Sequence, residues 1–267
     1  MSVQTGSPEE RLRSPDSLLS TLPDVRRARG WRLYAADGTR IISLWSDYGR
    51  NLLGYTPRGL AGHAKSAIDR GLVAPVAGSW NGRIVRMVRR IFPEYGTVRL
   101  LRDAETSPGL EHARFLFDSY LPQSMSQDRD APMRIVLPIP AALSPGILAA
   151  ATAAPLRSFE DEPVEGLRGA SAIFALSVMT SEKTSGALSA RFENAWQRFD
   201  GCGFKLFRRA GPWLMPNYPR EAQRELFAFC ASRGALISPE YDFPSSVPGD
   251  FDEGELSCLH EAASAFL

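Results

Sequence analysis

The stretch Asp37–Gly71, DGTRIISLWSDYGRNLLGYTPRGLAGHAKSAIDRG, decides the fold class of this chain. Its Asp-Gly dipeptide is typical of a tight turn, and the apolar residues of 40–44 predict a short strand. Two glycines then mark a loop, and Pro57 opens a segment whose apolar residues recur at helical spacing. The stretch therefore predicts a strand, a glycine loop and a helix. Ordinary αβ units without any site have the same order.

Length and composition indicate a globular protein of one or two domains. The chain has 267 residues, of which 44% are hydrophobic and 23% are charged, so it can bury a sizeable core. The net charge of +1 gives no reason to expect nucleic acid or an anionic membrane surface as a partner. The uncharged stretch Ile135–Leu156 contains four prolines, which argue against a transmembrane helix.

The cysteines and the N-terminus bear on the cellular compartment. The three cysteines are widely spaced and form no C-x-x-C motif, so no metal site is expected. An odd number of cysteines suits a reducing compartment. Residues 1–30 lack the apolar core of a signal peptide and predict a loose arm with a short helix near Leu18–Leu22. We therefore expect a cytoplasmic protein.

The order of motifs in Asp37–Gly71 resembles the N-terminal region of class III aminotransferases. These are fold-type I pyridoxal-phosphate enzymes and include glutamate-1-semialdehyde aminomutase. The family has a D-G-x-x-Y-L-D strand, a glycine loop, L-L-G-H-x-x-P, and a helix that ends near D-R-G. Here Asp37-Gly38, Leu52-Leu53-Gly54, Pro57 and Asp69-Arg70-Gly71 occupy those places, and Tyr55 stands where the family usually has histidine.

The last third of the chain is similar to the same family in its order of elements. A strand over 204–209 is followed by a helix over Arg220–Ser232, which Gly234 ends. A strand over Ala235–Ser238 and a final helix over Asp250–Phe266 complete the pattern. The resemblance thus covers about residues 31–118 and 200–267.

The resemblance implies an α/β protein with a reduced fold-type I transferase architecture. After the arm, 31–97 and 200–267 would form a small α/β domain from both chain ends. Residues 98–199 would form a shrunken central sheet domain of the cofactor-binding type, because too few residues remain for the usual long crossovers. Within it, Arg134–Ile139 and Ala170–Val178 are predicted as buried strands.

Lys183 is the candidate Schiff-base residue, because a pyridoxal enzyme needs one lysine and only Lys65, Lys183 and Lys205 are present. Small residues follow Lys183, as they follow the family lysine. A second alignment remains open, in which Thr184–Ala190 matches the family segment that opens the helix linking the domains. Lys183 would then be an exposed residue before that helix, and no catalytic lysine would remain.

Two further segments are candidates for cofactor binding. DEPVEGLR resembles the family's D-E-V-x-x-G-F/L-R and would make Asp161 the partner of the pyridine nitrogen. A charged surface loop is the alternative interpretation. Thr106 and Ser107 stand where the family holds the cofactor phosphate at a helix N-terminus. Simple helix capping is the alternative there, and neighbouring Asp103 and Glu105 would repel a phosphate.

An amphipathic helix is predicted over Asn81–Phe92, with arginines on one face. This basic face is interpreted as solvated, with an anion site as the alternative. The family works as dimers, so the resemblance implies a homodimer. Trp31, Leu44, Trp45 and Trp80 lie in a segment that the family uses for subunit contact.

Three hypotheses for function follow from the sequence. The first is a degenerate, non-catalytic family member that binds a small amino-acid-like ligand or a partner. The second is an active pyridoxal-phosphate aminotransferase or aminomutase that uses Lys183. The third is a subunit that completes a site with another chain.

Overall fold

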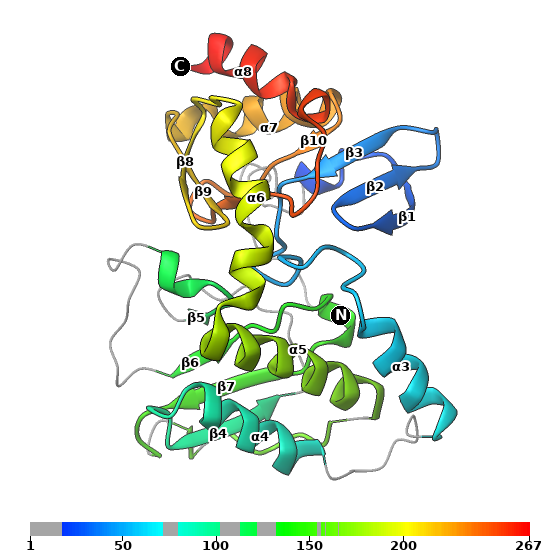
Figure 1. Ribbon diagram of the computed structural model, residues 1–267, viewed down its shortest axis with the longest axis vertical. Coiled ribbons are helices and arrows are strands. Elements are labelled where there is room, and N and C mark those ends of the chain that lie inside the picture. Colours follow the sequence, from blue (N-terminus) through cyan, green and yellow to red (C-terminus); the bar gives the residue numbers. More distant parts are fainter. Residues whose placement is uncertain are drawn as a thin grey trace, which may run out of the picture. The chain divides into compact units, whose positions relative to one another are not determined.

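The computed structural model describes residues 18–71, 80–101, 113–121, 132–153, 156–157, 159–164 and 166–267 (Figure 1). The chain divides into two compact units. Unit 1 comprises Met1–Ser46 together with Ala195–Leu267, and unit 2 comprises Asp47–Asn194. The fold is mixed α/β, and one unit is built from both chain ends, as the sequence predicts.

In unit 1, an N-terminal hairpin sheet is completed by a strand from the C-terminal third. The strand order is β1-β2-β3-β10, with bounds Val25–Arg29, Arg32–Ala35, Arg40–Ser43 and Ala235–Leu236. The first three strands pair antiparallel, whereas β10 pairs parallel with β3. The predicted strands at 40–44 and 235–238 are therefore neighbours in one sheet.

Gly234 makes the junction between the chain ends possible. It follows the C-terminus of α7, Gln223–Ser232, with a φ of 83°, a conformation that favours glycine. A Cβ at this position would lie 3.0 Å from the carbonyl oxygen of Arg40. The carbonyl of Gly234 in turn accepts a hydrogen bond of 2.8 Å from the amide of Ile42.

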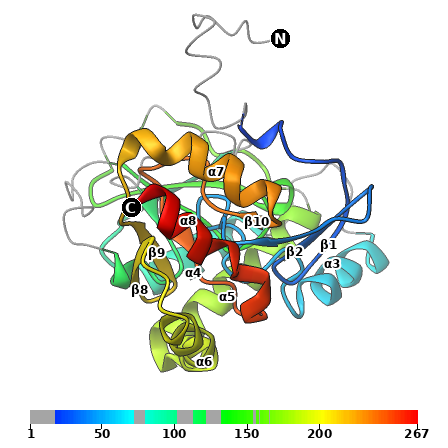
Figure 2. The ribbon, with the colours of Figure 1, turned by 90° about the horizontal axis from the view of Figure 1, so that it is seen from above.

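A second sheet and two helices complete unit 1. The sheet has the antiparallel order β11-β9-β8, with bounds Ser245–Ser246, Trp213–Pro216 and Phe207–Ala210. Helix α8, Cys258–Phe266, lies beside α7 (Figure 2). Before α8, Asp252 caps the 3-10 turn Glu253–Leu256 in a capping box with Glu255.

Unit 2 contains a small sheet of order β4-β7-β6-β5. The bounds are Thr97–Leu101, Gly146–Ala150, Met133–Ile135 and Ala113–Arg114. Strand β7 pairs antiparallel with β4 and with β6, and β5 pairs parallel with β6. All residues of β7 are buried, which agrees with its uninterrupted apolar sequence.

The three described helices longer than a single turn that lie wholly in unit 2 pack together. They are α3, Leu60–Asp69; α4, Trp80–Ile91; and α5, Gly166–Ser185. Helices α3 and α4 both contact α5 (Figure 1). The prediction from the sequence had placed residues 31–97 with the chain ends, whereas the compact units divide after Ser46 and after Asn194. Helix α6, Ala187–Gly201, crosses the second division.

The strand predicted over Ala170–Val178 is wrong, because these residues lie in the middle of α5. Residues 170–176 are buried without exception, so the helix shows almost no polar face there. A short run that is apolar on all sides has the same pattern in a buried strand and in a buried helix. Because the helix runs without a break from Gly166 to Ser185, the apolar run belongs to a buried helix and not to a strand.

Among the described residues, no helix is long and apolar enough to cross a membrane. The stretch Ile135–Leu156 contributes to the sheet of unit 2 instead. Of the residues predicted for a subunit contact, Leu44 is fully buried within unit 1. Trp31, Trp45 and Trp80 are only partly exposed.

Candidate functional site

Lys183 lies in the last turn of α5, and its side chain reaches the end of α4. Its ammonium group donates a hydrogen bond to the backbone carbonyl of Ile91 and lies 4.8 Å from the centre of the Phe92 ring. The residue is exposed, as the second alignment predicted, but it belongs to a helix that continues to Ser185. Lys183 does precede the predicted linking helix, which is α6, but it lies in the last turn of α5 and not in a loop. The helix break is at Gly186, with a φ of 59°.

Asp161 lies in the segment that precedes α5, and its carboxylate binds this segment to β4 through two hydrogen bonds. One carboxylate oxygen accepts a hydrogen bond of 3.1 Å from the amide of Leu100, and the other accepts one of 3.2 Å from Arg99. The neighbouring Glu162 carbonyl accepts a hydrogen bond of 2.9 Å from the side chain of Asn81, at the start of α4. Asp161 is thus used in packing the segment against the sheet.

Lys183 and the segment that contains Asp161 contact opposite ends of α4. The Asn81 side chain donates to the carbonyl of Glu162, next to Asp161, whereas the Ile91 carbonyl accepts from Lys183. An α-helix rises about 1.5 Å per residue, so about 15 Å of helix separates these two contacts. A Schiff-base lysine and the partner of the pyridine nitrogen must reach the same small ring.

The predicted phosphate-binding residues Thr106 and Ser107 lie outside the described residues, as does His112. Ala113 and Arg114, which follow directly, form strand β5, and a 3-10 turn over Asp118–Tyr120 comes next.

Lys183 lines a cavity of about 290 Å³ between the ends of α4 and α5 and the turn after β5. Aromatic side chains and two carboxylates share this cavity with Lys183. The lining side chains include Phe92, Phe115, Asp118, Tyr120, Glu182 and Lys183. Glu182 is already engaged, because its carboxylate accepts hydrogen bonds of 2.7 and 3.0 Å from the first amides of α6.

Asp118 is the carboxylate that the fold brings to Lys183. It follows Phe117, whose φ of 65° is a left-handed conformation that is rare for a bulky residue. Burial raises the pKa of Asp118 above the usual range of an aspartate, and the positive charges of Arg114 and Lys183 offset only part of this effect. The Arg114 guanidinium lies 3.6 Å from the carboxylate.

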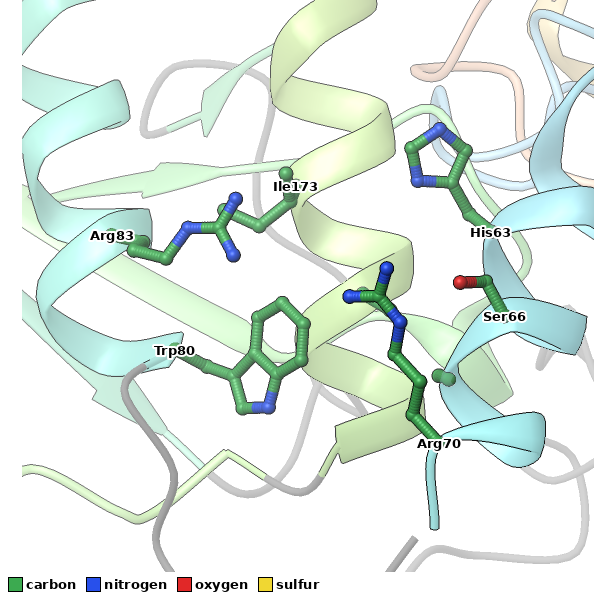
Figure 3. A pocket seen from close by; sticks show the side chains of 8 residues that line it. His63, Ser66, Arg70, Trp80, Arg83 and Ile173 are labelled. Carbon is green, nitrogen blue, oxygen red and sulfur yellow. The ribbon is translucent and has the colours of Figure 1, made fainter. Parts of the chain in front are cut away.

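A second cavity, of about 240 Å³, lies between α3, α4 and α5. The polar side chains that point into it are His63, Ser66 and Arg70 from α3 and Arg83 from α4 (Figure 3). Trp80, at the start of α4, forms one wall, and α5 supplies apolar residues at the back.

Trp80 is fixed by a close approach to α5. A Cβ added at Gly169 would lie 2.4 Å from the Cγ atom of the Trp80 indole, so only glycine leaves room for this ring. The Arg83 guanidinium lies 5.3 Å from the centre of the same ring, within the range of a cation–π contact. The wall of the cavity is therefore set by packing.

Comparison with known proteins assigns the fold. No family model matches the chain. A protein of Borreliella burgdorferi, described as an uncharacterized protein, is 27% identical over 259 residues, 90% of this chain and 89% of that protein.

Three solved structures are similar at low sequence identity. N-acetylornithine aminotransferase from Stenotrophomonas maltophilia K279a has a TM-score of 0.61 and 13% identity, covering 92% of this chain and 96% of that chain. An omega-transaminase from Sphaerobacter thermophilus has a TM-score of 0.60 and 10% identity, and the match covers 98% of this chain and 97% of that chain. Plasmodium falciparum ornithine delta-aminotransferase has a TM-score of 0.59 and 12% identity, and the match covers 97% of this chain and 99% of that chain. The chain therefore has a fold-type I, aminotransferase-like fold.

Sequence reasoning missed Asp118 and the grouping of His63, Ser66 and Arg70. Asp118 follows the apolar run Phe115–Phe117, and a lone acid after such a run gives no functional signal. The α3 residues do have a signal, since positions i, i+3 and i+7 share one face of a helix. The sequence does not show that Arg83, on the basic face of Asn81–Phe92, lies opposite these residues, because only the packing of α3 and α4 on α5 brings them together.

Proposed function

We propose that this chain is an aminotransferase-like protein that does not carry pyridoxal phosphate on a lysine and acts by binding a small ligand or a partner. The observation that carries the proposal is that Lys183 and the segment that contains Asp161 contact opposite ends of α4. Transamination needs a lysine, a carboxylate and a phosphate cup that converge on one pocket. The predicted lysine instead donates to the Ile91 carbonyl, and the predicted carboxylate holds β4.

The ligand proposed for the Lys183 cavity is small and amino-acid-like. Lys183 offers a positive charge for a carboxylate, and Asp118 offers a negative charge for an ammonium group. Phe92 and Phe115 supply apolar surface between them. Such a combination of opposite charges and an apolar wall is typical of small-molecule sites. N-acetylornithine and ornithine, named by two of the structural neighbours, are suitable probes.

The first experiment tests for a lysine-bound cofactor. Purified protein is mixed with pyridoxal phosphate, scanned for the visible absorbance of the lysine-bound cofactor, and treated with borohydride before peptide mapping. We expect no band and no modified lysine. A band that borohydride fixes on Lys183, and that Lys183→Ala abolishes, would contradict the proposal.

The same experiment tests the alternative function, an active pyridoxal-phosphate aminotransferase that uses Lys183. One observation favours this alternative: Lys183 lines the cavity that also contains Asp118. In that case Asp118, and not Asp161, would be the carboxylate near the cofactor bound to Lys183. Loss of the absorbance band in Asp118→Asn, with the band retained in Asp161→Asn, would then be expected.

The second experiment tests ligand binding. Calorimetric titration with ornithine and with N-acetylornithine is compared between the native chain and Asp118→Asn. We expect binding that Asp118→Asn weakens, because that substitution removes the negative charge that faces an ammonium group. Binding that is unchanged in Asp118→Asn and in Lys183→Ala would place the ligand elsewhere.

We also propose that the chain forms a homodimer in a reducing cytoplasm. Trp31, Trp45 and Trp80 retain partial exposure, and aromatic surface favours burial in a contact. Cys202, Cys230 and Cys258 are free thiols, which supports a reducing compartment. Sedimentation at micromolar protein should give the dimer mass, and a strictly monomeric profile would contradict this proposal.

A further inference from the structure

We infer that the cavity between α3, α4 and α5 binds the phosphate group of a small phosphorylated molecule. Among the described residues that line it, every polar side chain can donate hydrogen bonds and none is a carboxylate: His63, Ser66, Arg70, Trp80 and Arg83. Two guanidinium groups with a hydroxyl and an imidazole form a donor set that suits the oxygens of a phosphate.

The two arginines share the cavity without a described acidic partner. In the described part of unit 2, the arginines that form ion pairs are Arg50, Arg99 and Arg114. The sequence between α3 and α4, LVAPVAGS, contains no acidic residue. Like charges that face one small space repel each other, and an anion between them converts this repulsion into attraction. The cavity therefore favours a negatively charged ligand.

The donors come from helices whose positions are fixed by packing. His63, Ser66 and Arg70 occupy one face of α3 because of their spacing, and Figure 3 shows all three side chains directed toward the cavity. Arg83 approaches from α4 on the other side. The His63 ring is itself held by Phe174 of α5, with ring centres 5.3 Å apart. The packing of the helices therefore brings these donors to one cavity, with the His63 and Trp80 rings held against α5.

The back of the cavity is apolar and suits the organic part of such a ligand. Ala67, Ala170 and Ile173 are buried side chains at this surface. The volume of about 240 Å³ corresponds to roughly eight water molecules at about 30 Å³ each, enough for a phosphate with a small organic group. Trp80, held in place by Gly169, offers a flat surface to that group.

This site goes beyond the function proposed above, since it shares no lining residue with the Lys183 cavity. The two proposals can therefore fail independently. Lys183→Ala should leave phosphate binding unchanged, whatever the result of the pyridoxal phosphate experiment.

The test is calorimetric titration of the full chain with inorganic phosphate at constant ionic strength. The double variant Arg70→Gln/Arg83→Gln is compared with Lys65→Gln/Arg86→Gln. The control pair removes the same charge from the same two helices at exposed positions that do not line the cavity. We expect phosphate to bind the native chain, and the first pair to weaken binding at least about tenfold. The control pair should change it by less than about twofold.

Three results would overturn the inference. They are the absence of phosphate binding to the native chain, an equal loss in both double variants, and equal binding of acetate and phosphate. An equal loss would show a general effect of net charge, and equal binding of acetate would exclude selection for a tetrahedral oxyanion. Circular dichroism of each variant checks that the fold is retained. Quenching of Trp80 fluorescence by phosphate, lost in Trp80→Phe, gives a second readout of the same site.

Discussion

Unit 1 and unit 2 use their charged side chains in different ways. In unit 1, the Arg32 guanidinium lies 3.1 Å from Asp250 and 2.7 Å from Glu255, so its charge is satisfied inside the unit. In unit 2, Arg70 and Arg83 line a cavity without a described acidic partner, and Asp118 and Lys183 line another. Unit 2 also contains ion pairs, such as Arg114 with Asp118, but the charged groups that line its cavities lie where a ligand can reach them. Unit 1 instead uses the Arg32 charge to join the two chain ends.

The largest expected effect is in unit 1. Glu255→Ala removes the closer of the two carboxylates that contact Arg32, whose side chain is only 14% exposed, and it also removes half of the capping box with Asp252. Asp250 remains, so the loss is that of the charged hydrogen bonds to Glu255 and of a helix cap, together about 3 kcal/mol. The change should lower the free energy of unfolding by this amount in a urea titration.

The exposed pair Arg233–Glu261, with its atoms 3.0 Å apart, provides the control for Glu255→Ala. Its side chains are 44% and 58% exposed, so Glu261→Ala should cost less than about 1 kcal/mol. Equal losses of unfolding free energy in Glu255→Ala and Glu261→Ala would contradict the prediction, because they would show that the partly buried pair stabilises no more than the exposed one.

The next effect compares two helical glycines of unit 2. Gly169→Ala places a Cβ against Trp80 and should destabilise the chain by about 2 kcal/mol, because the ring has to move. It should also weaken phosphate binding at the neighbouring cavity. Gly62→Ala in α3 meets no atom within 4 Å and should stabilise by up to about 1 kcal/mol through helix propensity. Changes of the same sign in thermal unfolding would contradict this prediction.

Asp118 and Glu255 should give opposite pH dependence of stability. The raised pKa of Asp118 means that the folded state binds this proton more tightly than the unfolded state. Stability is then lost as pH rises from the ordinary value of 3.8 through the raised pKa. For Glu255, burial opposes ionisation, but hydrogen bonds from Arg32 and from the Asp252 amide outweigh it and lower the pKa. Its contribution is present above the ordinary value of 4.5 and is lost as pH falls through the lowered pKa.

Urea titrations across the acidic range separate these two groups. Asp118→Asn should make stability rise more steeply with pH, because the opposing contribution is removed. Glu255→Gln should make the rise less steep. If Asp118→Asn leaves the slope unchanged, the Asp118 carboxylate titrates in the folded state as it does in the unfolded chain.

The smallest effect is expected for Lys183→Ala. The residue is exposed, and its substitution removes one hydrogen bond to Ile91 and a contact with the Phe92 ring. We expect a loss below about 1 kcal/mol in urea unfolding. A loss of several kcal/mol would instead indicate that the Lys183 ammonium holds the ends of α4 and α5 together.

Local patterns predicted many of the elements. The strand at 40–44, the helix over Asn81–Phe92 and the helix over Arg220–Ser232 are all found, with ends shifted by a few residues. Each has a periodic apolar face or a clear stop signal, and those are short-range properties of the chain. The strand predicted over Ala170–Val178 is wrong because this segment is apolar on nearly every face, so its hydrophobic pattern could not distinguish a strand from a helix.

The sequence by itself determined the α/β class, the end of a helix at Gly234 and the aminotransferase-like order of elements, and the resemblance in that order implied a domain built from both chain ends. Only the tertiary structure decided which side chains meet. It placed Asp161 against β4, brought Asp118 to Lys183, and set Arg83 opposite Arg70. The physical reason is that helix and strand signals depend on neighbours within a few residues. A site instead depends on contacts between distant segments, which are fixed by packing on a shared core such as α5.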